Sequence, residues 1–217
     1  MAEPSRNRNV IRSIAWNLQK TFRLFPRDFC LITGAPRSGT SALSDWLGTQ
    51  SGVSSIPESR ILISIHRFIE ESQRFQNLNK NHILLEDLAR ALVHDYYSNS
   101  RMLLGKRLLV EKEPLEPIAF PNQDYEKFIA NILKVIPQAR LLLAIRDPIA
   151  TIWSMHKRAW GNSLSNPDAR RFSLEEYAGN WCACADLIHR QSSAPNVYVV
   201  QFGRLVHDSQ AESKRIL

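Results

Sequence analysis

The sequence predicts a three-layer α/β/α fold built on a parallel sheet, because short apolar runs alternate with longer segments of helical periodicity. The apolar runs cover residues 28–33, 107–111, 139–145 and 197–201. Strands this apolar are buried on both faces, which is typical of a parallel sheet covered by helices. With 217 residues, of which 44% are apolar and 23% charged, the chain has the size and composition of one globular domain.

Helical patterns separate the apolar runs. Apolar residues at spacings of three and four predict helices over about 60–76, 82–98, 125–136 and 173–192. After the third apolar run, Asp147 and Pro148 have the character of an N-cap and a first helical residue, so we expect a further helix that ends near Arg158. The chain stops at Leu217 inside a helix expected from near Asp208, so we expect the domain to lack its last elements.

The first 27 residues differ from the rest of the chain in charge. They hold six basic side chains and one acidic side chain, a net of +5, which leaves +2 of the total +7 for the other residues. Apolar residues recur at helical spacing within 10–25, namely Ile11, Ile14, Leu18, Phe22 and Phe25. We therefore predict a basic amphipathic extension over residues 1–27, followed by one domain over residues 28–217. Its apolar stripe has two interpretations, a helix packed on the domain edge and a peripheral membrane contact.

Composition and charge exclude several classes of protein. The nearly neutral body argues against nucleic-acid binding, which needs a basic face on the folded part. No apolar run approaches the roughly 18 residues of a membrane-spanning helix, and no signal-like apolar stretch follows the first residues. Cys30, Cys182 and Cys184 lack metal-ligand spacing, and an odd number of cysteines disfavours a disulfide framework. We expect a cytoplasmic protein with reduced thiols, membrane-peripheral if residues 10–25 bind lipid.

A glycine loop after the first apolar run is the most informative motif. Residues 34–41 read Gly-Ala-Pro-Arg-Ser-Gly-Thr-Ser. Between a strand and a helix, such a loop directs backbone N–H groups and the positive helix end toward one point, a geometry that binds phosphate or sulfate. The nucleotide-binding pattern GxxxxGK[ST] fits except that Thr40 replaces its lysine, and the cation of the loop is Arg37. A P-loop kinase or NTPase without this lysine and a turn that only reverses the chain are the alternatives.

Pro-Arg-Ser-Gly-Thr at residues 36–40 resembles the 5′-phosphosulfate loop of sulfotransferases that use 3′-phosphoadenosine 5′-phosphosulfate (PAPS). The third apolar run leads to Arg146 and Ser154, similar to the segment that binds the 3′-phosphate in that family, and Arg158 lies one helical turn beyond Ser154. The resemblance covers about residues 28–206. It implies the P-loop nucleoside-kinase-like sulfotransferase fold and donor binding without a metal. The donor-binding residues that it implies are Arg37, Ser38, Gly39, Thr40, Ser41, Arg146, Ser154 and Arg158.

The arginine-containing loop is most similar to tyrosylprotein and related bacterial-type sulfotransferases. Those relatives carry a Glu-x-Arg segment beyond the loop, which Glu58-Ser59-Arg60 matches, so the resemblance implies that Glu58 is the catalytic base. The alternative is that Glu58 only caps the following helix. His66 is a second candidate base. Arg37 would be the main charge stabiliser of the transferring group.

A Lys-x-Pro segment of the same family resembles Glu111-Lys112-Glu113-Pro114. The resemblance implies that Lys112 reaches the sulfuryl group, and the alternative is that its flanking glutamates neutralise it.

The resemblance implies transfer of a sulfuryl group from PAPS to an acceptor, which we expect to be a hydroxyl on a small molecule, a lipid or a peptide. One departure keeps a third function open. The family carries Tyr-Glu-Asp-Leu-Val after the fourth apolar run, and this chain has Phe-Gly-Arg-Leu-Val at 202–206. Phe202 lacks the hydroxyl that can touch the nucleotide, and the acidic pair is missing. A degenerate nucleotide-binding protein without turnover is therefore the other alternative.

Overall fold

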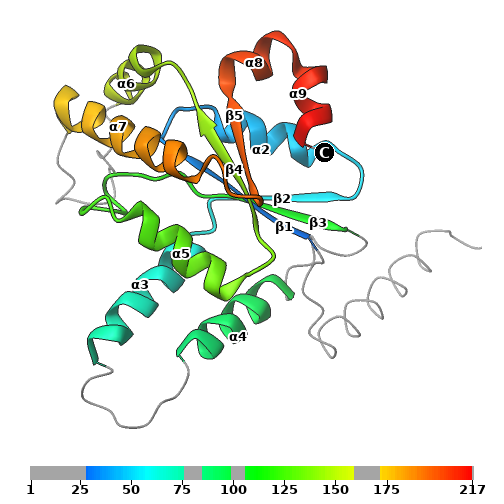
Figure 1. The fold of residues 1–217 in the computed structure, drawn as a ribbon, viewed down its shortest axis with the longest axis vertical. Coiled ribbons are helices and arrows are strands. Elements are labelled where there is room, and N and C mark those ends of the chain that lie inside the picture. Colours follow the sequence, from blue (N-terminus) through cyan, green and yellow to red (C-terminus); the bar gives the residue numbers. More distant parts are fainter. Residues whose placement is uncertain (1–27, 76–84, 99–105, 159–171, 217) are drawn as a thin grey trace, which may run out of the picture.

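A computed structural model describes residues 28–75, 85–98, 106–158 and 172–216, so the predicted extension over residues 1–27 lies outside the described residues. The described part forms a five-stranded parallel sheet in the order β2-β3-β1-β4-β5, with helices on both faces (Figure 1). The strands are β1 (Asp28–Gly34), β2 (Val53–Pro57), β3 (Leu108–Lys112), β4 (Arg140–Ile145) and β5 (Val197–Gln201). The helices are α2 (Thr40–Gly48), α3 (Ile61–Phe75), α4 (Leu85–Ser98), α5 (Tyr125–Val135), α6 (Pro148–Lys157), α7 (Leu174–Gln191), α8 (Phe202–His207) and α9 (Ser209–Ile216). The predicted three-layer α/β/α fold is confirmed.

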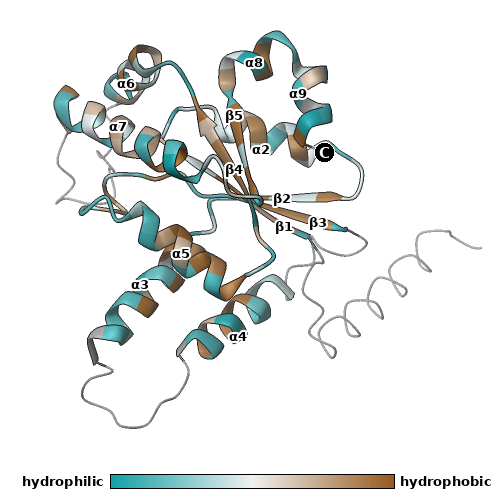
Figure 2. Cartoon of the chain, in the orientation of Figure 1, coloured by the Kyte–Doolittle hydropathy of each residue, from teal (hydrophilic) through white to brown (hydrophobic). Residues whose placement is uncertain are grey.

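Two apolar cores lie on the two faces of the sheet, because successive side chains of a strand point to opposite faces. On β1, Phe29 and Leu31 belong to the core covered by α3, α4, α5 and α7, whereas Cys30 and Ile32 belong to the core covered by α2, α8 and α9. Figure 2 shows the apolar strands in brown between helices whose outer faces are teal. Of the three cysteines, Cys30 and Cys184 are buried, and none forms a disulfide. No helix among the described residues is long and apolar enough to cross a membrane.

The edge strand β2 was not predicted. Its sequence, Val-Ser-Ser-Ile-Pro, carries two serines and pairs with β3 alone. The hydroxyl of Ser55 lies 2.7 Å from that of Ser44 on α2, so polar side chains join this strand to its covering helix. The four other strands begin and end within one residue of their predicted bounds. An edge strand with one hydrogen-bonded neighbour does not need the uniform apolar sequence of a central strand.

The order of the strands determines where a site can form. Strand β1 lies between β3 and β4, so the chain leaves β1 at the point where the winding of the sheet reverses. Ligands of parallel α/β sheets bind outside the carboxyl ends of the strands at such a point. The loop 34–41, Glu58, Lys112, Arg146 and Phe202 lie at or directly beyond the carboxyl ends of the five strands.

Candidate active site

The glycine loop between β1 and α2 makes two close backbone approaches. A Cβ atom on Gly34 would lie 2.3 Å from the carbonyl oxygen of Ala144, and one on Gly39 would lie 2.1 Å from Cδ2 of Phe202. Gly39 has φ +98 and is the N-cap of α2, with no side chain capping the helix. The first N–H groups of a helix have no partner within the helix, so they are available to an anion in the loop.

We expect Gly39→Ala to lower the free energy of unfolding by about 1–3 kcal/mol more than Gly52→Ala. Gly52 is the matched control because it also has positive φ (+80), yet an added Cβ would have nothing within 4 Å. The difference between the two variants therefore isolates the contact with the Phe202 ring. Urea unfolding of both variants measures it, and equal losses would show that Phe202 moves aside at little cost.

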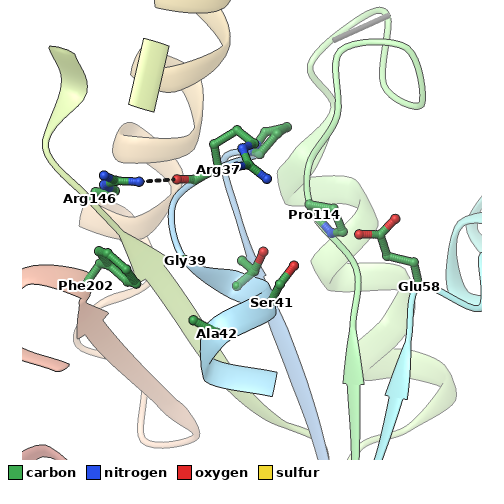
Figure 3. A pocket seen from close by; sticks show the side chains of 10 residues that line it. Arg37, Gly39, Ser41, Ala42, Glu58, Pro114, Arg146 and Phe202 are labelled. Atoms are coloured by element: carbon green, nitrogen blue, oxygen red, sulfur yellow. Dashed lines mark hydrogen bonds between the residues drawn. The ribbon is translucent and has the colours of Figure 1, made fainter. Parts of the chain in front are cut away.

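A cavity of about 220 Å³ opens at the carboxyl edge of the sheet (Figure 3). Its wall combines the loop with residues from the ends of other strands: Pro36, Arg37, Gly39, Thr40, Ser41, Ala42, Glu58, Pro114, Arg146 and Phe202. In Figure 3, Glu58 lies on the opposite side of this cavity from Arg146 and Phe202, with the loop between them.

Arg37 and Arg146 line the end of the cavity next to β4, and the charge of Arg158 at the end of α6 reaches Arg37. We call these three residues the arginine group. The Nε atom of Arg37 donates a hydrogen bond to Oγ of Ser154 on α6 at 3.1 Å, and Nη1 of Arg146 donates to the carbonyl oxygen of Arg37 at 3.4 Å. Partial burial, together with the positive charges of Arg158 and Arg146, lowers the pKa of Arg37. The Cζ atom of Arg146 also lies 5.0 Å from the centre of the Phe202 ring. Like charges held this close favour an anionic ligand.

A buried hydroxyl provides a test of whether the loop fits a phosphate or sulfate group. Ser38 is 1% exposed, and its Oγ atom has no hydrogen-bond partner among the described residues. A buried donor without a partner is costly, and an anionic oxygen in the loop would accept its hydrogen bond. The uncapped start of α2 and the arginine group point to the same ligand chemistry, so the residues fit an anion.

Lys112 and Glu58 meet on the other side of the cavity, where β3 and β2 end. The Nζ atom of Lys112 donates to Oγ of Ser41 at 3.0 Å and forms an ion pair with Oε1 of Glu58. The glutamates that flank Lys112 have other partners. Glu111 accepts hydrogen bonds from the hydroxyls of Ser59 and Tyr97, and Glu113 accepts one from the backbone N–H of Arg60. The ionic partner of Lys112 is thus Glu58, and the alternating sides of an extended chain explain why its sequence neighbours are not.

The start of α3 bears on the alternative that Glu58 is only a helix cap. The backbone N–H of Ile61 donates to Oγ of Ser59 at 3.2 Å, so Ser59 supplies the side-chain oxygen there. The ion pairs of Glu58 join Lys112 and, at 3.6 Å, Nη2 of Arg60. These contacts leave the carboxylate beside the cavity.

Five residues singled out from the sequence do not line the cavity: Ser38, Lys112, Ser154, Arg158 and His66. Of these, Lys112 and Ser154 form hydrogen bonds with residues that do line it. Arg158 is exposed at the end of α6, although its charge reaches Arg37. His66 is 3% exposed and packs against the rings of Phe120 and Phe128, with Nε2 at 3.5 Å from Asp124. Burial lowers the pKa of His66. The structure thus brings Arg37, Ser41, Glu58 and Arg146 together, and it does not bring His66 to them.

Sequence reasoning missed a group of buried acids behind Glu58. Burial raises the pKa of Glu111 to about 7 and the pKa of Glu113 to about 8, and it also raises the pKa of Glu116. The spacing Glu-x-Glu-x-x-Glu at 111–116 was the available signal. Acidic residues beside a strand end are usually exposed, so the spacing alone did not predict their burial.

The pH dependence of stability should show the raised pKa of Glu111. As the pH rises from 5 to 8, we expect the free energy of unfolding of the unchanged protein to fall by about 1–3 kcal/mol more than that of Glu111→Gln. The pKa of Glu111 is higher in the folded chain, about 7, than its ordinary value of 4.5, so the unfolded chain releases this proton first. The contribution is therefore complete below about pH 4.5 and lost as the pH rises through about 7. Urea unfolding at several pH values measures the difference, and a constant difference would show that Glu111 does not titrate in this window.

Comparison with known proteins decides the family. A sequence profile of the sulfotransferase family matches residues 30–217. The chain belongs to the sulfotransferase family. Among solved structures, it is similar to a sulfotransferase domain from the curacin biosynthetic pathway, with a TM-score of 0.57 and 18% identity over 88% of this chain and 72% of that one. It is also similar to sulfotransferase STF9 from Mycobacterium avium, with a TM-score of 0.49 and 15% identity over 91% of this chain and 64% of that one.

Family membership makes sulfuryl transfer the general activity that the fold supports. At 18% identity, the likeness to the curacin-pathway domain shows the fold alone. No curated protein matches the sequence significantly. The functions of individual residues of this sulfotransferase must therefore be argued from its own geometry.

Proposed function

We propose that this sulfotransferase transfers the sulfuryl group of PAPS to a hydroxyl acceptor. The observation that carries the proposal is the hydrogen bond of 3.1 Å between Arg37 and Ser154, which joins the loop after β1 to the helix after β4. Two features that would suit anions thereby lie side by side, the start of α2 and the arginine group near α6. A donor with a phosphosulfate at one end and a separate phosphate at the other fits such a pair.

Each end of the donor has its own set of residues. The loop N–H groups, Ser38, Thr40 and the guanidinium of Arg37 would hold the phosphosulfate, whereas Arg146, Ser154 and Arg158 would hold the 3′-phosphate. The sulfuryl group would pass in line to the acceptor oxygen as its S–O bond to the donor phosphate breaks, with 3′-phosphoadenosine 5′-phosphate as the leaving group.

On the acceptor side, the proposal concerns Glu58 and Lys112. Glu58 would remove the proton of the acceptor hydroxyl, because its carboxylate lines the cavity within reach of an incoming group. Lys112 would hold Glu58 in place through their ion pair and present a positive charge toward the transferring group.

A small molecule, a lipid or a peptide bearing the hydroxyl is the proposed acceptor. Residues 1–27 are proposed as a separate extension, with peripheral membrane contact through residues 10–25, and both points stay predictions because these residues lie outside the described part.

We expect 3′-phosphoadenosine 5′-phosphate to bind equally well with and without EDTA, and Arg146→Ala to weaken binding roughly ten- to a hundredfold. Arg146 would donate charged hydrogen bonds to the 3′-phosphate, and its loss removes about 1.5–3 kcal/mol. Isothermal titration calorimetry measures both effects. The matched ligand is adenosine 5′-phosphate, which lacks the 3′-phosphate. Equal affinity for the two nucleotides would contradict the assignment.

A further inference from the structure

Three glutamates to which the proposed reaction gives no role lie behind Glu58. Glu111 and Glu113 are 0% exposed and Glu116 is 3% exposed. A buried carboxyl group is costly unless hydrogen bonds satisfy it, so its partners indicate what it stabilises. Glu111 is held by Ser59 and Tyr97, whereas Glu113 and Glu116 both contact Arg60.

Arg60 lies in a strained turn between β2 and α3. It has φ +62, a left-handed conformation that costs a residue with a side chain roughly 1–2 kcal/mol. Such a conformation persists only where its surroundings stabilise it. Here the backbone N–H of Arg60 donates to Oε2 of Glu113 at 3.1 Å, and the N–H of Glu58 donates to the carbonyl oxygen of Lys112 at 3.1 Å. The chain after β3 therefore holds the turn that presents Glu58.

The guanidinium of Arg60 lies between the buried glutamates and Glu58. Its Nη2 atom donates to Oε2 of Glu116 at 2.8 Å and lies 3.6 Å from Oε2 of Glu58. Its Nη1 atom lies 3.7 Å from Oε1 of Glu113. The buried Glu116 thus holds the guanidinium by a hydrogen bond, and Oε1 of Glu113, which has no hydrogen-bond partner among the described residues, lies beside it. Both glutamates therefore restrict where the half-exposed Arg60 side chain can meet the Glu58 carboxylate.

Glu113 is itself anchored to the centre of the sheet. Its backbone N–H donates to the carbonyl oxygen of Ile32 at 2.9 Å, and its carbonyl oxygen accepts from Oγ1 of Thr33 at 2.7 Å. Both partners lie on β1, which continues into the glycine loop. The glutamate thus connects the central strand to the turn of Glu58, and its own side chain does not line the described cavity.

We propose that Glu113 is a positioning residue which, through the backbone and side chain of Arg60, holds the carboxylate of Glu58 at the cavity. The proposal rests on the proposed role of Glu58 as the base. A catalytic base must lie within hydrogen-bond reach of its proton, and a displacement of about 1 Å can cost on the order of a hundredfold in rate. Burial raises the pKa of Glu113 to about 8, so near neutral pH this carboxyl group mostly carries a proton. Glutamine then reproduces both its shape and its charge.

The test compares Glu113→Ala with Glu113→Gln in kcat, acceptor KM and affinity for 3′-phosphoadenosine 5′-phosphate. We expect Glu113→Ala to lower kcat about ten- to a hundredfold and to leave nucleotide affinity within about threefold. Glu113→Gln should recover most of the turnover, because its amide oxygen can accept the hydrogen bond of the Arg60 N–H.

The matched control is Glu212→Ala on α9, which removes another buried glutamate paired with an arginine, Arg215. This control should lose stability and keep kcat. If Glu113→Ala does not bind nucleotide, Glu113→Met replaces it, because methionine fills the volume without accepting a hydrogen bond.

A double variant separates this proposal from the proposed function. If Glu113 acts through Glu58, adding Glu113→Ala to Glu58→Gln lowers kcat little further. Full turnover in Glu58→Gln would overturn the base assignment and the positioning role with it. Impaired turnover in Glu58→Gln with normal turnover in Glu113→Ala would overturn the positioning role alone. Equal loss in Glu113→Ala and Glu113→Gln, or additive losses in the double variant, would also contradict it.

Discussion

Glu58→Gln should lower turnover by about 10²–10⁴ while affinity for 3′-phosphoadenosine 5′-phosphate stays nearly unchanged. Glutamine keeps the size of the side chain and can still accept the hydrogen bond from Lys112, but it cannot take a proton from the acceptor hydroxyl. The loss should therefore appear in kcat and kcat/KM together, as for an interaction that acts in the transition state.

Single-turnover measurements with saturating donor provide the test, because they show whether the chemical step limits the rate. Near-full turnover of Glu58→Gln under those conditions would place the proton acceptor elsewhere. Nucleotide affinity measured on the same sample controls for folding, since Glu58 contacts Lys112 and Arg60 and lies across the cavity from Arg146.

For Arg37→Ala, we expect two losses at once, a decrease of about 10²–10³ in kcat and weaker donor binding. Arg37 lies inside the loop that would hold the phosphosulfate, so its charge would contact the donor before and during transfer. Its removal also breaks the hydrogen bond to Ser154.

Ser154→Ala separates these two effects. It removes the same hydrogen bond and leaves the Arg37 charge in the loop, so we expect weaker donor binding with a small change in kcat. Presteady-state kinetics of both variants at saturating PAPS measure the rates. If Ser154→Ala lowered kcat as much as Arg37→Ala, the hydrogen bond between the two segments would matter and the charge of Arg37 would not.

The sequence predicted the strands that stand out as apolar runs. The central strands β1, β3 and β4 are apolar because helices cover both their faces. Strand β5 lies at the edge opposite β2, and it was visible because Val-Tyr-Val-Val is apolar even though Tyr198 is exposed. Strand β2 lies at the edge and carries Ser54 and Ser55, so the same pattern was missing there. Helix α8, which follows β5 directly, is six residues long and too short for a helical period to stand out.

The site likewise has a part that the sequence predicted and a part that it did not. The loop and its arginines lie in local motifs, so residues such as Arg37 and Arg146 could be singled out from the sequence. The contacts of Arg60 with Glu113 and Glu116 join residues 53 and 56 positions apart, and they form because β2 runs beside β3 with Pro57 opposite Lys112. Without β2, nothing in the sequence aligned these segments, and the buried glutamates had no visible partner.

The contact between Gly39 and Phe202 makes the residue type allowed at one position depend on the residue at the other. The Phe202 ring occupies the space that a side chain at position 39 would need, and the same ring lies beneath the guanidinium of Arg146. A relative with alanine or serine at position 39 must therefore carry a smaller residue at position 202, in addition to bearing the backbone strain of φ +98, and it must then hold its arginine by other means. The two positions should covary among homologues, and a small residue at 202 should partly suppress the stability loss of Gly39→Ala, by the share that comes from the ring contact.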